Sequence, residues 1–207
     1  MLRVLGRLSS INVRKVVWMC AELRLDHERE DWGVGFRDPQ SPDFLALNPN
    51  ALVPVIEDQG FVLWESSAIV RYLARKHGGG RLLGGALEDQ ALIDQWLGWQ
   101  ATELNSSWSY AVQALIRKKT GYDSPADIEN SIAGWTEKMA ILDAQLERTG
   151  AYVAGTAFSA ADIAMGLSVQ RWYAAPFHKR DFGNVAGYFE RLKRETEISR
   201  HGLLDYP

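Results

Sequence analysis

The stretch that decides the fold runs from residue 52 to residue 69 and reads LVPVIEDQGFVLWESSAI. Two apolar runs, 52–56 and 61–64, flank the polar connection 57–60, a pattern typical of a β-hairpin. The pair Ser66-Ser67 then precedes the apolar segment 68–73, which predicts a helix with Ser66 at its N-cap. The glycines at 78–80 end that helix. A hairpin followed by a helix therefore closes the first part of the chain.

Before this stretch, the sequence alternates between strand and helix signals. Residues 2–6 predict a short strand, and residues 13–23 carry apolar side chains at spacings of three and four, as an amphipathic helix does. A second strand is expected at 27–32, a loop at 33–43 and a single helical turn at 44–47. The predicted order is β-α-β-α-β-β-α.

From about residue 87 onwards, only helical periodicity remains. Four apolar stripes predict helices, at about 93–115, 128–146, 159–173 and 185–192. The glycine-rich segment 78–86 is the expected boundary between two domains. The fold class is therefore an α/β domain over residues 1–80 followed by an all-helical domain over residues 86–207.

Composition narrows the function classes. The 207 residues carry a net charge of −3 without a basic face, so we expect no nucleic-acid partner. The chain has no block of like charges and no apolar run of about 18 residues, so we expect no membrane partner. Cys20 is the only cysteine, which excludes an intramolecular disulfide and a cysteine-based zinc site. We expect no metal and a cytoplasmic location.

The connection before the first helix contains candidate catalytic residues. Ser10 and Asn12 lie where a helix N-terminus offers unpaired N–H groups and a partial positive charge. A free thiol has a pKa near about 8.5, and a donor aimed at its sulfur would favour the thiolate. The alternative is that both residues only cap the helix.

Two further groups lie around the hairpin. Pro54 inside an apolar run suggests a cis bond that turns the Val53 backbone outward, where it could pair with an extended peptide. The alternative is a trans proline in an edge strand. Glu65, Ser66 and Ser67 would suit the charged head of an α-amino acid, with free amides for the carboxylate and Glu65 for the amino group. The alternative is an ordinary serine cap.

Four motifs in register resemble those of cytosolic glutathione transferases. They are SINVRK at 10–15, NPN at 48–50 with Val53-Pro54, ESSAI at 65–69, and FSAADIA at 158–164. The last motif also predicts a structural capping box between Ser159 and Asp162. The resemblance covers nearly the whole chain and implies a thioredoxin-like N-terminal domain followed by an all-helical domain.

The resemblance also implies roles for individual residues, with glutathione as co-substrate. Ser10 matches the serine that activates the thiol in theta- and delta-like members, and Asn12 is similar to a residue of nu-like bacterial members. The implied glutathione-binding residues are Val53, Pro54, Glu65, Ser66 and Ser67. The aromatic residues expected to line the electrophile site, or alternatively to pack in the core, are Trp108, Tyr110, Trp172 and Tyr173.

The sequence departs from the family pattern before Val53. Relatives often carry a basic residue there for the glycine carboxylate of glutathione, whereas this chain has Ala51 and Leu52. Arg14 and Arg37 are possible substitutes. Cys20 falls on an apolar stripe and is expected in the core rather than at the site.

The resemblance implies a homodimer that conjugates the glutathione thiolate to small hydrophobic electrophiles. Two alternatives remain open at this point: a glutathione-dependent disulfide-bond reductase and a non-catalytic binding module.

Overall fold

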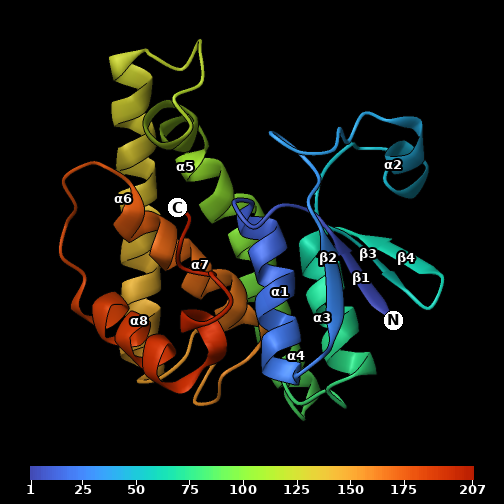
Figure 1. Cartoon of the computed structure of the whole chain (residues 1–207). Helices are drawn as coiled ribbons and strands as arrows, with labels where there is room; N and C mark the ends of the chain where they lie inside the picture. The colour runs from blue at the N-terminus through green and yellow to red at the C-terminus, as the bar shows by residue number, and fades with distance from the viewer.

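The computed structural model describes residues 1–207 and begins with a four-stranded sheet (Figure 1). The strands are β1 (Leu2–Leu5), β2 (His27–Glu30), β3 (Val55–Asp58) and β4 (Phe61–Trp64), in the spatial order β2-β1-β3-β4. β2 runs parallel to β1, while β3 is antiparallel to both β1 and β4. The predicted hairpin is confirmed. The strand expected at 27–32 is shorter than predicted, because Trp32 leaves the ladder and bridges to Arg37.

Two helices cover one face of this sheet, and a short helix packs at one end of the opposite face. α1 (Ile11–Leu23) and α3 (Ser66–Lys76) lie between the sheet and the helical domain (Figure 1). The short helix α2 (Pro42–Leu47) packs Phe44 against Leu5 and Val55 in a small separate cluster. The sheet and its helices thus form the thioredoxin-like N-terminal domain that the sequence predicts.

The C-terminal domain is entirely helical. Its helices are α4 (Leu87–Trp99), α5 (Asn105–Ala111), α6 (Pro125–Thr149), α7 (Ala160–Ala174) and α8 (Gly183–Glu195). α4 and α5 are joined by a π-helical turn over Gln100–Leu104, a second π turn covers Val112–Ile116, and a short 3-10 helix spans Glu197–Ser199. No helix is both long and apolar enough to span a membrane.

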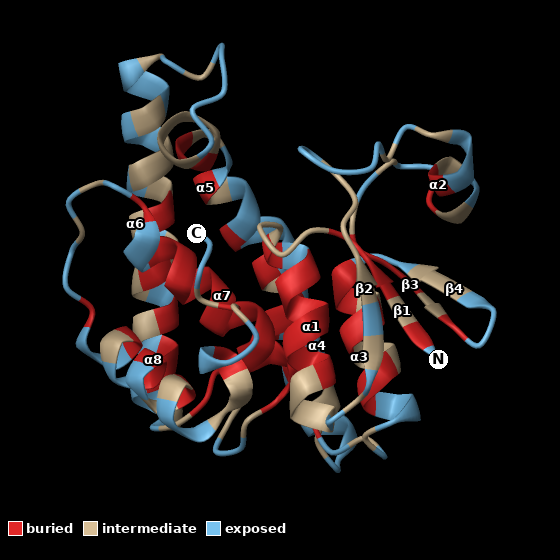
Figure 2. Ribbon diagram, in the orientation of Figure 1, coloured by how far each residue is buried: buried red, intermediate tan, exposed pale blue.

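The two domains share one hydrophobic core, which passes through α1 and α7. Both helices are buried over most of their length (Figure 2). Gly166 of α7 permits the close approach, because a Cβ there would lie 2.8 Å from the Trp18 ring and 2.7 Å from Leu192. The position of α1 is therefore fixed from both sides, by the sheet and by the helical domain.

Asp162 forms the predicted capping box at the start of α7. Its Oδ2 accepts hydrogen bonds from the backbone N–H of Ser159 at 2.9 Å and from the Ser159 hydroxyl at 3.0 Å. Its Oδ1 accepts from the backbone N–H of Val153 and from the Tyr188 hydroxyl, each at 2.9 Å. One fully buried carboxylate therefore ties together three segments of the helical domain.

A second buried carboxylate holds α3 against the hairpin. Asp58 Oδ2 accepts hydrogen bonds from Lys76 Nζ at 2.9 Å and from Tyr72 Oη at 3.0 Å, and it lies 3.0 Å from His77 Nε2. Burial acts to raise the pKa of Asp58, but the hydrogen bonds outweigh it and lower the pKa to about 2. Asp58 is therefore ionised at neutral pH and fixes the far end of α3.

Candidate functional site

Gly6 brings the start of α1 against the segment before β3. Its φ of 150° lies in a region that favours glycine. A Cβ at this position would lie 2.4 Å from Val13 Cγ2 and 3.0 Å from Val53 Cβ. No larger residue fits between α1 and Val53, so the first turn of α1 lies next to the Val53 edge.

Ser10 and Asn12 stand at the first turn of α1 with their side chains unengaged. Ser10 occupies the N-cap position, where its backbone N–H donates to Arg7 O at 3.1 Å, but its hydroxyl makes no capping hydrogen bond. Asn12, the second residue of α1, is exposed. The Ser10 side chain therefore does not cap the helix, which was the alternative for this residue.

A hollow of about 220 Å³ opens at this edge, and we call it the edge pocket. It gathers residues from the start of α1, the 48–54 segment, the end of β4 and the start of α3. Its lining consists of Asn12, Asn48, Asn50, Leu52, Val53, Pro54, Trp64, Glu65 and Ser66. Five of the seven predicted catalytic and glutathione-binding residues thus meet in one place, although they lie up to 54 positions apart.

The Val53-Pro54 peptide bond is cis, as the sequence analysis expects. Asn48 supports this segment by donating from Nδ2 to Leu52 O at 2.7 Å. Neither the N–H nor the C=O of Val53 takes part in a backbone hydrogen bond. The Val53 backbone therefore presents a free donor and a free acceptor at the edge pocket.

Glu65, rather than Ser66, is the N-cap of α3. It has φ 74° and ψ 108°, an unfavourable conformation for a non-glycine residue, and its carboxylate accepts from the Ser67 N–H at 3.5 Å. Ser66 is therefore the first helical residue and not the cap that the sequence predicts. Ser66 and Ser67 are both buried, and the Ser67 hydroxyl has no partner. The start of α3 thus offers free N–H groups beside an exposed carboxylate.

Lys15 lies behind this helix start and was not singled out from the sequence. It is buried, and its Nζ donates to Gln100 Oε1 at 2.6 Å. Burial lowers the pKa of Lys15 to about 8, against an opposing effect of the Glu65 carboxylate. The π-helical turn that contains Gln100 therefore supports α1 from the helical domain.

Neither arginine considered for the glycine carboxylate is available at the edge pocket. Arg14 is fully buried and donates to Gln170 Oε1 at 3.1 Å and to Leu203 O at 2.9 Å. Arg37 pairs with Glu30 at 2.7 Å. The segment before Val53 instead contributes two polar residues to the edge pocket, Asn48 and Asn50. Asn50 Nδ2 donates a hydrogen bond to Asn48 Oδ1 at 2.9 Å. The NPN motif could have pointed to them.

The four aromatic residues expected at the electrophile site do not share one surface. Trp108 and Trp172 are buried, and both pack edge-on against Trp135, with ring centroids 5.3 and 5.2 Å from it. Tyr173 packs against Phe189 of α8, a helix that does not line the edge pocket. Both tryptophans therefore pack in the core, which is the alternative that the sequence analysis left open, because helical periodicity does not distinguish a core aromatic from a site aromatic.

Tyr110, the fourth of these aromatic residues, is half-buried. Its hydroxyl accepts from the Ser124 N–H at 3.3 Å, and its ring lies 5.0 Å from that of Tyr122. Of the four aromatic residues, Tyr110 thus contacts the loop that follows the second π turn.

Cys20 is buried, and burial raises the pKa of its thiol to about 12. It is therefore protonated and inaccessible, in agreement with the expectation that it belongs to the core. No group of three or more His, Cys, Asp or Glu side chains lies close enough together to hold a metal ion.

Comparisons with known proteins agree with this geometry. Residues 9–76 match the family of glutathione S-transferase N-terminal domains. Over 97% of its length the chain is 34% identical to glutathione S-transferase GstB of Escherichia coli, and the match covers 97% of that protein. It is 30% identical to glutathione S-transferase 4 of Zea mays, with 85% of this chain and 81% of the relative covered.

The fold also matches solved structures over nearly the whole chain. A theta class glutathione S-transferase of Xanthomonas axonopodis pv. citri, solved with glutathione bound, superposes with a TM-score of 0.88 at 29% identity. That match covers 94% of this chain and 93% of the other. A glutathione transferase of Bombyx mori, BmGSTD1, superposes with a TM-score of 0.86 at 26% identity, with 99% and 92% covered.

Proposed function

The chain belongs to the glutathione S-transferase family, and from this premise we propose that it conjugates glutathione to small hydrophobic electrophiles. The observation that carries the proposal is the convergence of Asn12, Val53, Glu65 and Ser66 on the edge pocket. In this proposal residues 1–80 bind glutathione, and residues 86–207 cover the electrophile. The activity would serve detoxification in the cytoplasm, where thiols are kept reduced.

Glutathione lies along the Val53 edge in this proposal. The free N–H and C=O of Val53 pair with the cysteinyl backbone, as an added strand would. The γ-glutamyl carboxylate meets the free N–H of Ser66 and the hydroxyls of Ser66 and Ser67, and the γ-glutamyl ammonium group meets the exposed Glu65 carboxylate. The glycine end reaches Asn50, which contributes a neutral contact where relatives often have a charge.

The sulfur then lies over the first turn of α1. The free hydroxyl of Ser10 and the amide of Asn12 donate to it, and the helix N-terminus adds a partial positive charge. These contacts favour the thiolate, whose proton passes to solvent. With an aryl chloride, the sulfur electron pair forms the C–S bond and the C–Cl electron pair leaves with chloride. The product is a thioether.

Replacing Glu65 by Gln tests the binding mode together with the activity. The wild-type protein is expected to release chloride from a neutral chloronitrobenzene in a glutathione-dependent reaction. Glu65→Gln is expected to raise the KM for glutathione about tenfold with kcat nearly unchanged, because a charge-assisted contact to the ammonium group is lost in ground and transition states alike. Initial rates over a range of glutathione concentrations measure both constants.

Glu28→Gln is the matched control, because it removes an exposed carboxylate from β2, away from the edge pocket. Its constants should equal those of the wild type. Binding of glutathione without chloride release would contradict the proposal in favour of a non-catalytic module. Reduction of glutathione mixed disulfides without conjugation would contradict it in favour of a reductase.

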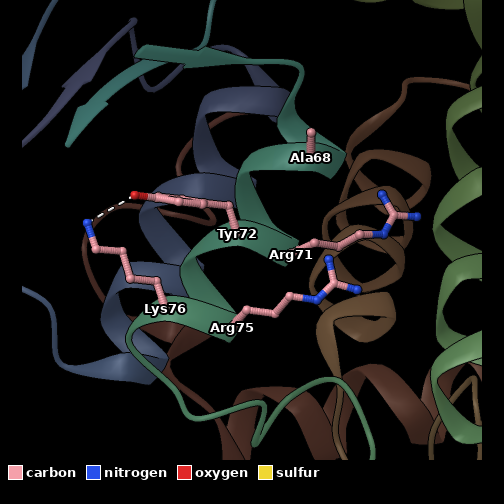
Figure 3. A pocket seen from close by; sticks show the side chains of 5 residues that line it. All are labelled: Ala68, Arg71, Tyr72, Arg75 and Lys76. Atoms are coloured by element: carbon pink, nitrogen blue, oxygen red, sulfur yellow. Dashed lines mark hydrogen bonds between the residues drawn. The ribbon is translucent and has the colours of Figure 1, made fainter. Parts of the chain in front are cut away.

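We further propose that the protein is a homodimer that associates through α3 and α4. A shallow hollow of about 580 Å³ on α3 is lined by Arg71, Arg75 and Lys76 (Figure 3). Lys76 Nζ lies 3.0 Å from Tyr72 Oη. The exposed Phe61 ring lies 5.2 Å from the Tyr72 ring beside it, and α4 carries the exposed apolar side chains Leu87 and Leu92. α4 also carries the exposed acid Glu88, which forms no ion pair, whereas Asp94 already pairs with Arg71 of the same chain. A two-fold contact would place the basic α3 of one protomer on the acidic α4 of the other.

Sedimentation equilibrium tests this association. The wild-type protein is expected to sediment at twice its chain mass of 23.2 kDa. Arg75→Glu should shift the equilibrium toward the monomer, because it places like charges opposite each other, while the circular dichroism spectrum stays the same. A wild-type protein that sediments as a monomer at all concentrations tested would contradict the proposal.

A further inference from the structure

The edge pocket is lined by nine residues, and only one of them is charged. Glu65 carries that charge, which is negative, whereas no lysine, arginine or histidine lines the pocket. Glutathione itself carries two carboxylates and one ammonium group at neutral pH. The pocket therefore matches the ammonium group with an opposite charge, but it offers no cation to either carboxylate.

The cations of the neighbouring helices are engaged elsewhere. Lys15 of α1 is buried, and its Nζ donates to Gln100 Oε1 at 2.6 Å. Arg71 of α3 pairs with Asp94 and donates to Ser67 O at 3.0 Å. Neither of them lines the edge pocket, and the two arginines considered above for the glycine carboxylate do not line it either. A carboxylate in this pocket therefore meets only neutral donors.

The two carboxylates of glutathione meet different ends of the edge pocket in the proposed binding mode. The γ-glutamyl carboxylate lies at the start of α3, where a helix N-terminus supplies N–H groups and a partial positive charge. With the cysteinyl backbone paired at Val53, the glycyl end points the opposite way, toward the segment 48–52. That segment follows the C-terminal end of α2, where the partial charge is negative. The glycyl carboxylate is therefore the group that the pocket does not balance.

Hydrogen bonds fix which amide atoms of Asn50 remain free. Asn48 is buried, and its Nδ2 donates to Leu52 O at 2.7 Å, so its Oδ1 is left as an acceptor. That Oδ1 accepts from the backbone N–H of Asn50 at 3.0 Å and from Asn50 Nδ2 at 2.9 Å. Asn50 Nδ2 therefore faces Asn48, and Asn50 Oδ1 has no partner. The exposed Asn50 thus presents a free acceptor together with the second N–H of its amide group.

An amide at the glycyl end complements Asn50 better than a carboxylate does. An amide N–H donates to the free Asn50 Oδ1, and the amide carbonyl accepts the remaining Asn50 N–H. A carboxylate only accepts, so it leaves that Oδ1 without a donor. Leu52 and Trp64 line the same pocket and are 65% and 41% exposed, so apolar surface surrounds this end. A charge without a counter-ion is unfavourable beside such a surface.

We propose that the preferred thiol substrate is a glutathione derivative whose glycyl carboxylate is replaced by a carboxamide. The inference rests on the proposed transferase function, and it specifies the thiol substrate of the same site. The reaction itself is unchanged: the sulfur electron pair forms the C–S bond, and the leaving group departs with its own electron pair. The amide end takes no part in these steps and acts only in binding.

Two thiols that differ only at the glycyl end test this preference. One is glutathione, and the other is its analogue with a primary amide in place of the glycyl carboxylate. The kcat/KM of each thiol with a neutral chloronitrobenzene is divided by the uncatalysed rate of the same thiol, which removes differences in thiol reactivity. We expect an amide-to-acid ratio of about ten for the wild-type protein, expressed mainly in KM, because one hydrogen bond is gained and one unpaired charge is avoided.

Leu52→Lys is the informative variant, because it places a cation at the glycyl end on an exposed position and leaves the core intact. It should raise kcat/KM for glutathione about tenfold and leave that for the amide nearly unchanged, so the ratio falls to about one. Leu52→Gln has a similar length without the charge and should keep most of the amide preference. Ile141→Lys adds the same charge to an exposed apolar residue of α6, outside the pocket, and should keep the wild-type ratio.

The outcomes separate this preference from the function on which it rests. Conjugation of both thiols with equal constants, or with a preference for glutathione, would overturn the inference and leave the transferase function in place. Conjugation of neither thiol would overturn the transferase function itself. A ratio that Leu52→Lys lowers no more than Leu52→Gln does would overturn the inference by placing the glycyl end away from the segment 48–52.

Discussion

Replacing Ser10 and Asn12 together by alanine is expected to lower kcat/KM for conjugation about a hundredfold near neutral pH, the scale of losing preorganised donors to a developing anion. The Ser10 hydroxyl makes no capping hydrogen bond, and the Asn12 side chain is exposed at the edge pocket. Their donors are therefore free to meet the sulfur. Without them the pKa of the bound thiol rises toward about 8.5, and less thiolate is present.

The loss of rate in the double variant is expected to depend on pH. Below the pKa of the bound thiol, the rate falls about tenfold for each unit by which the pKa is raised. The ratio of wild type to double variant should therefore be largest in mildly acidic buffer and should shrink above about pH 9, where the thiol ionises without help. Measuring kcat/KM for both proteins across this pH range tests the prediction.

Ser10→Thr is the rescue control, because it keeps the hydroxyl, and it should retain most of the activity. The thermal midpoint should change little in the double variant, because neither side chain stabilises the helix through a cap. An unchanged rate, or a loss that is equal at all pH values, would contradict the roles proposed for Ser10 and Asn12.

Replacing Asp162 by alanine is expected to lower the free energy of unfolding by about 4 kcal/mol, because it leaves several buried donors unpaired. Asp162 accepts from the N–H groups of Val153 and Ser159 and from the hydroxyls of Ser159 and Tyr188. Asp162→Asn keeps an acceptor at Oδ1 and should cost about half as much. Urea denaturation followed by tryptophan fluorescence measures these differences.

Asp162 also has a distinctive pH dependence. Burial raises its pKa to about 6, against the opposing effect of its hydrogen bonds. The pKa of Asp162 is thus higher in the folded protein than its value of about 3.9 in the unfolded chain. The stability that Asp162 contributes is therefore complete below about pH 3.9 and is lost as the pH rises through 6. The stability difference between wild type and Asp162→Asn should therefore be larger near pH 4 than at pH 7.

Ser159→Ala is the control for the Asp162 variants, because it removes one hydroxyl donor and leaves the carboxylate in place. It should cost only about 1 kcal/mol. A loss in Asp162→Ala no greater than in Ser159→Ala would show that the buried carboxylate does not hold the three segments together. Conjugation by the folded fraction should be unchanged in all three variants, since Asp162 lies outside the edge pocket.

Much of the fold could be predicted because local patterns act within short segments. The hairpin at 55–64 follows from two apolar runs around a polar connection, and the helix at 125–149 follows from apolar spacings of three and four. The edge of β2 could not be predicted, because Trp32 looks like a strand residue but bridges to Arg37 in the loop. The two π-helical turns also lack a sequence signal of their own.

Part of the candidate site could likewise be predicted from the sequence, and part of it could not. Motif residues around Val53 and Glu65 could be placed together, because the element order of the family fixes their positions. The cap at Glu65 could not be anticipated, because serine is the more frequent N-cap and only the backbone angles reveal the exception.

The most direct measurement is an ultraviolet titration of the glutathione thiol bound to the wild-type protein. The thiolate absorbs where the thiol does not, so the titration reports the pKa of the sulfur in the complex. We predict a pKa at least about one unit below the value near 8.5 of a free thiol. A bound thiol that titrates like free glutathione, or a protein that does not bind glutathione, would contradict the proposal that the first turn of α1 activates the sulfur.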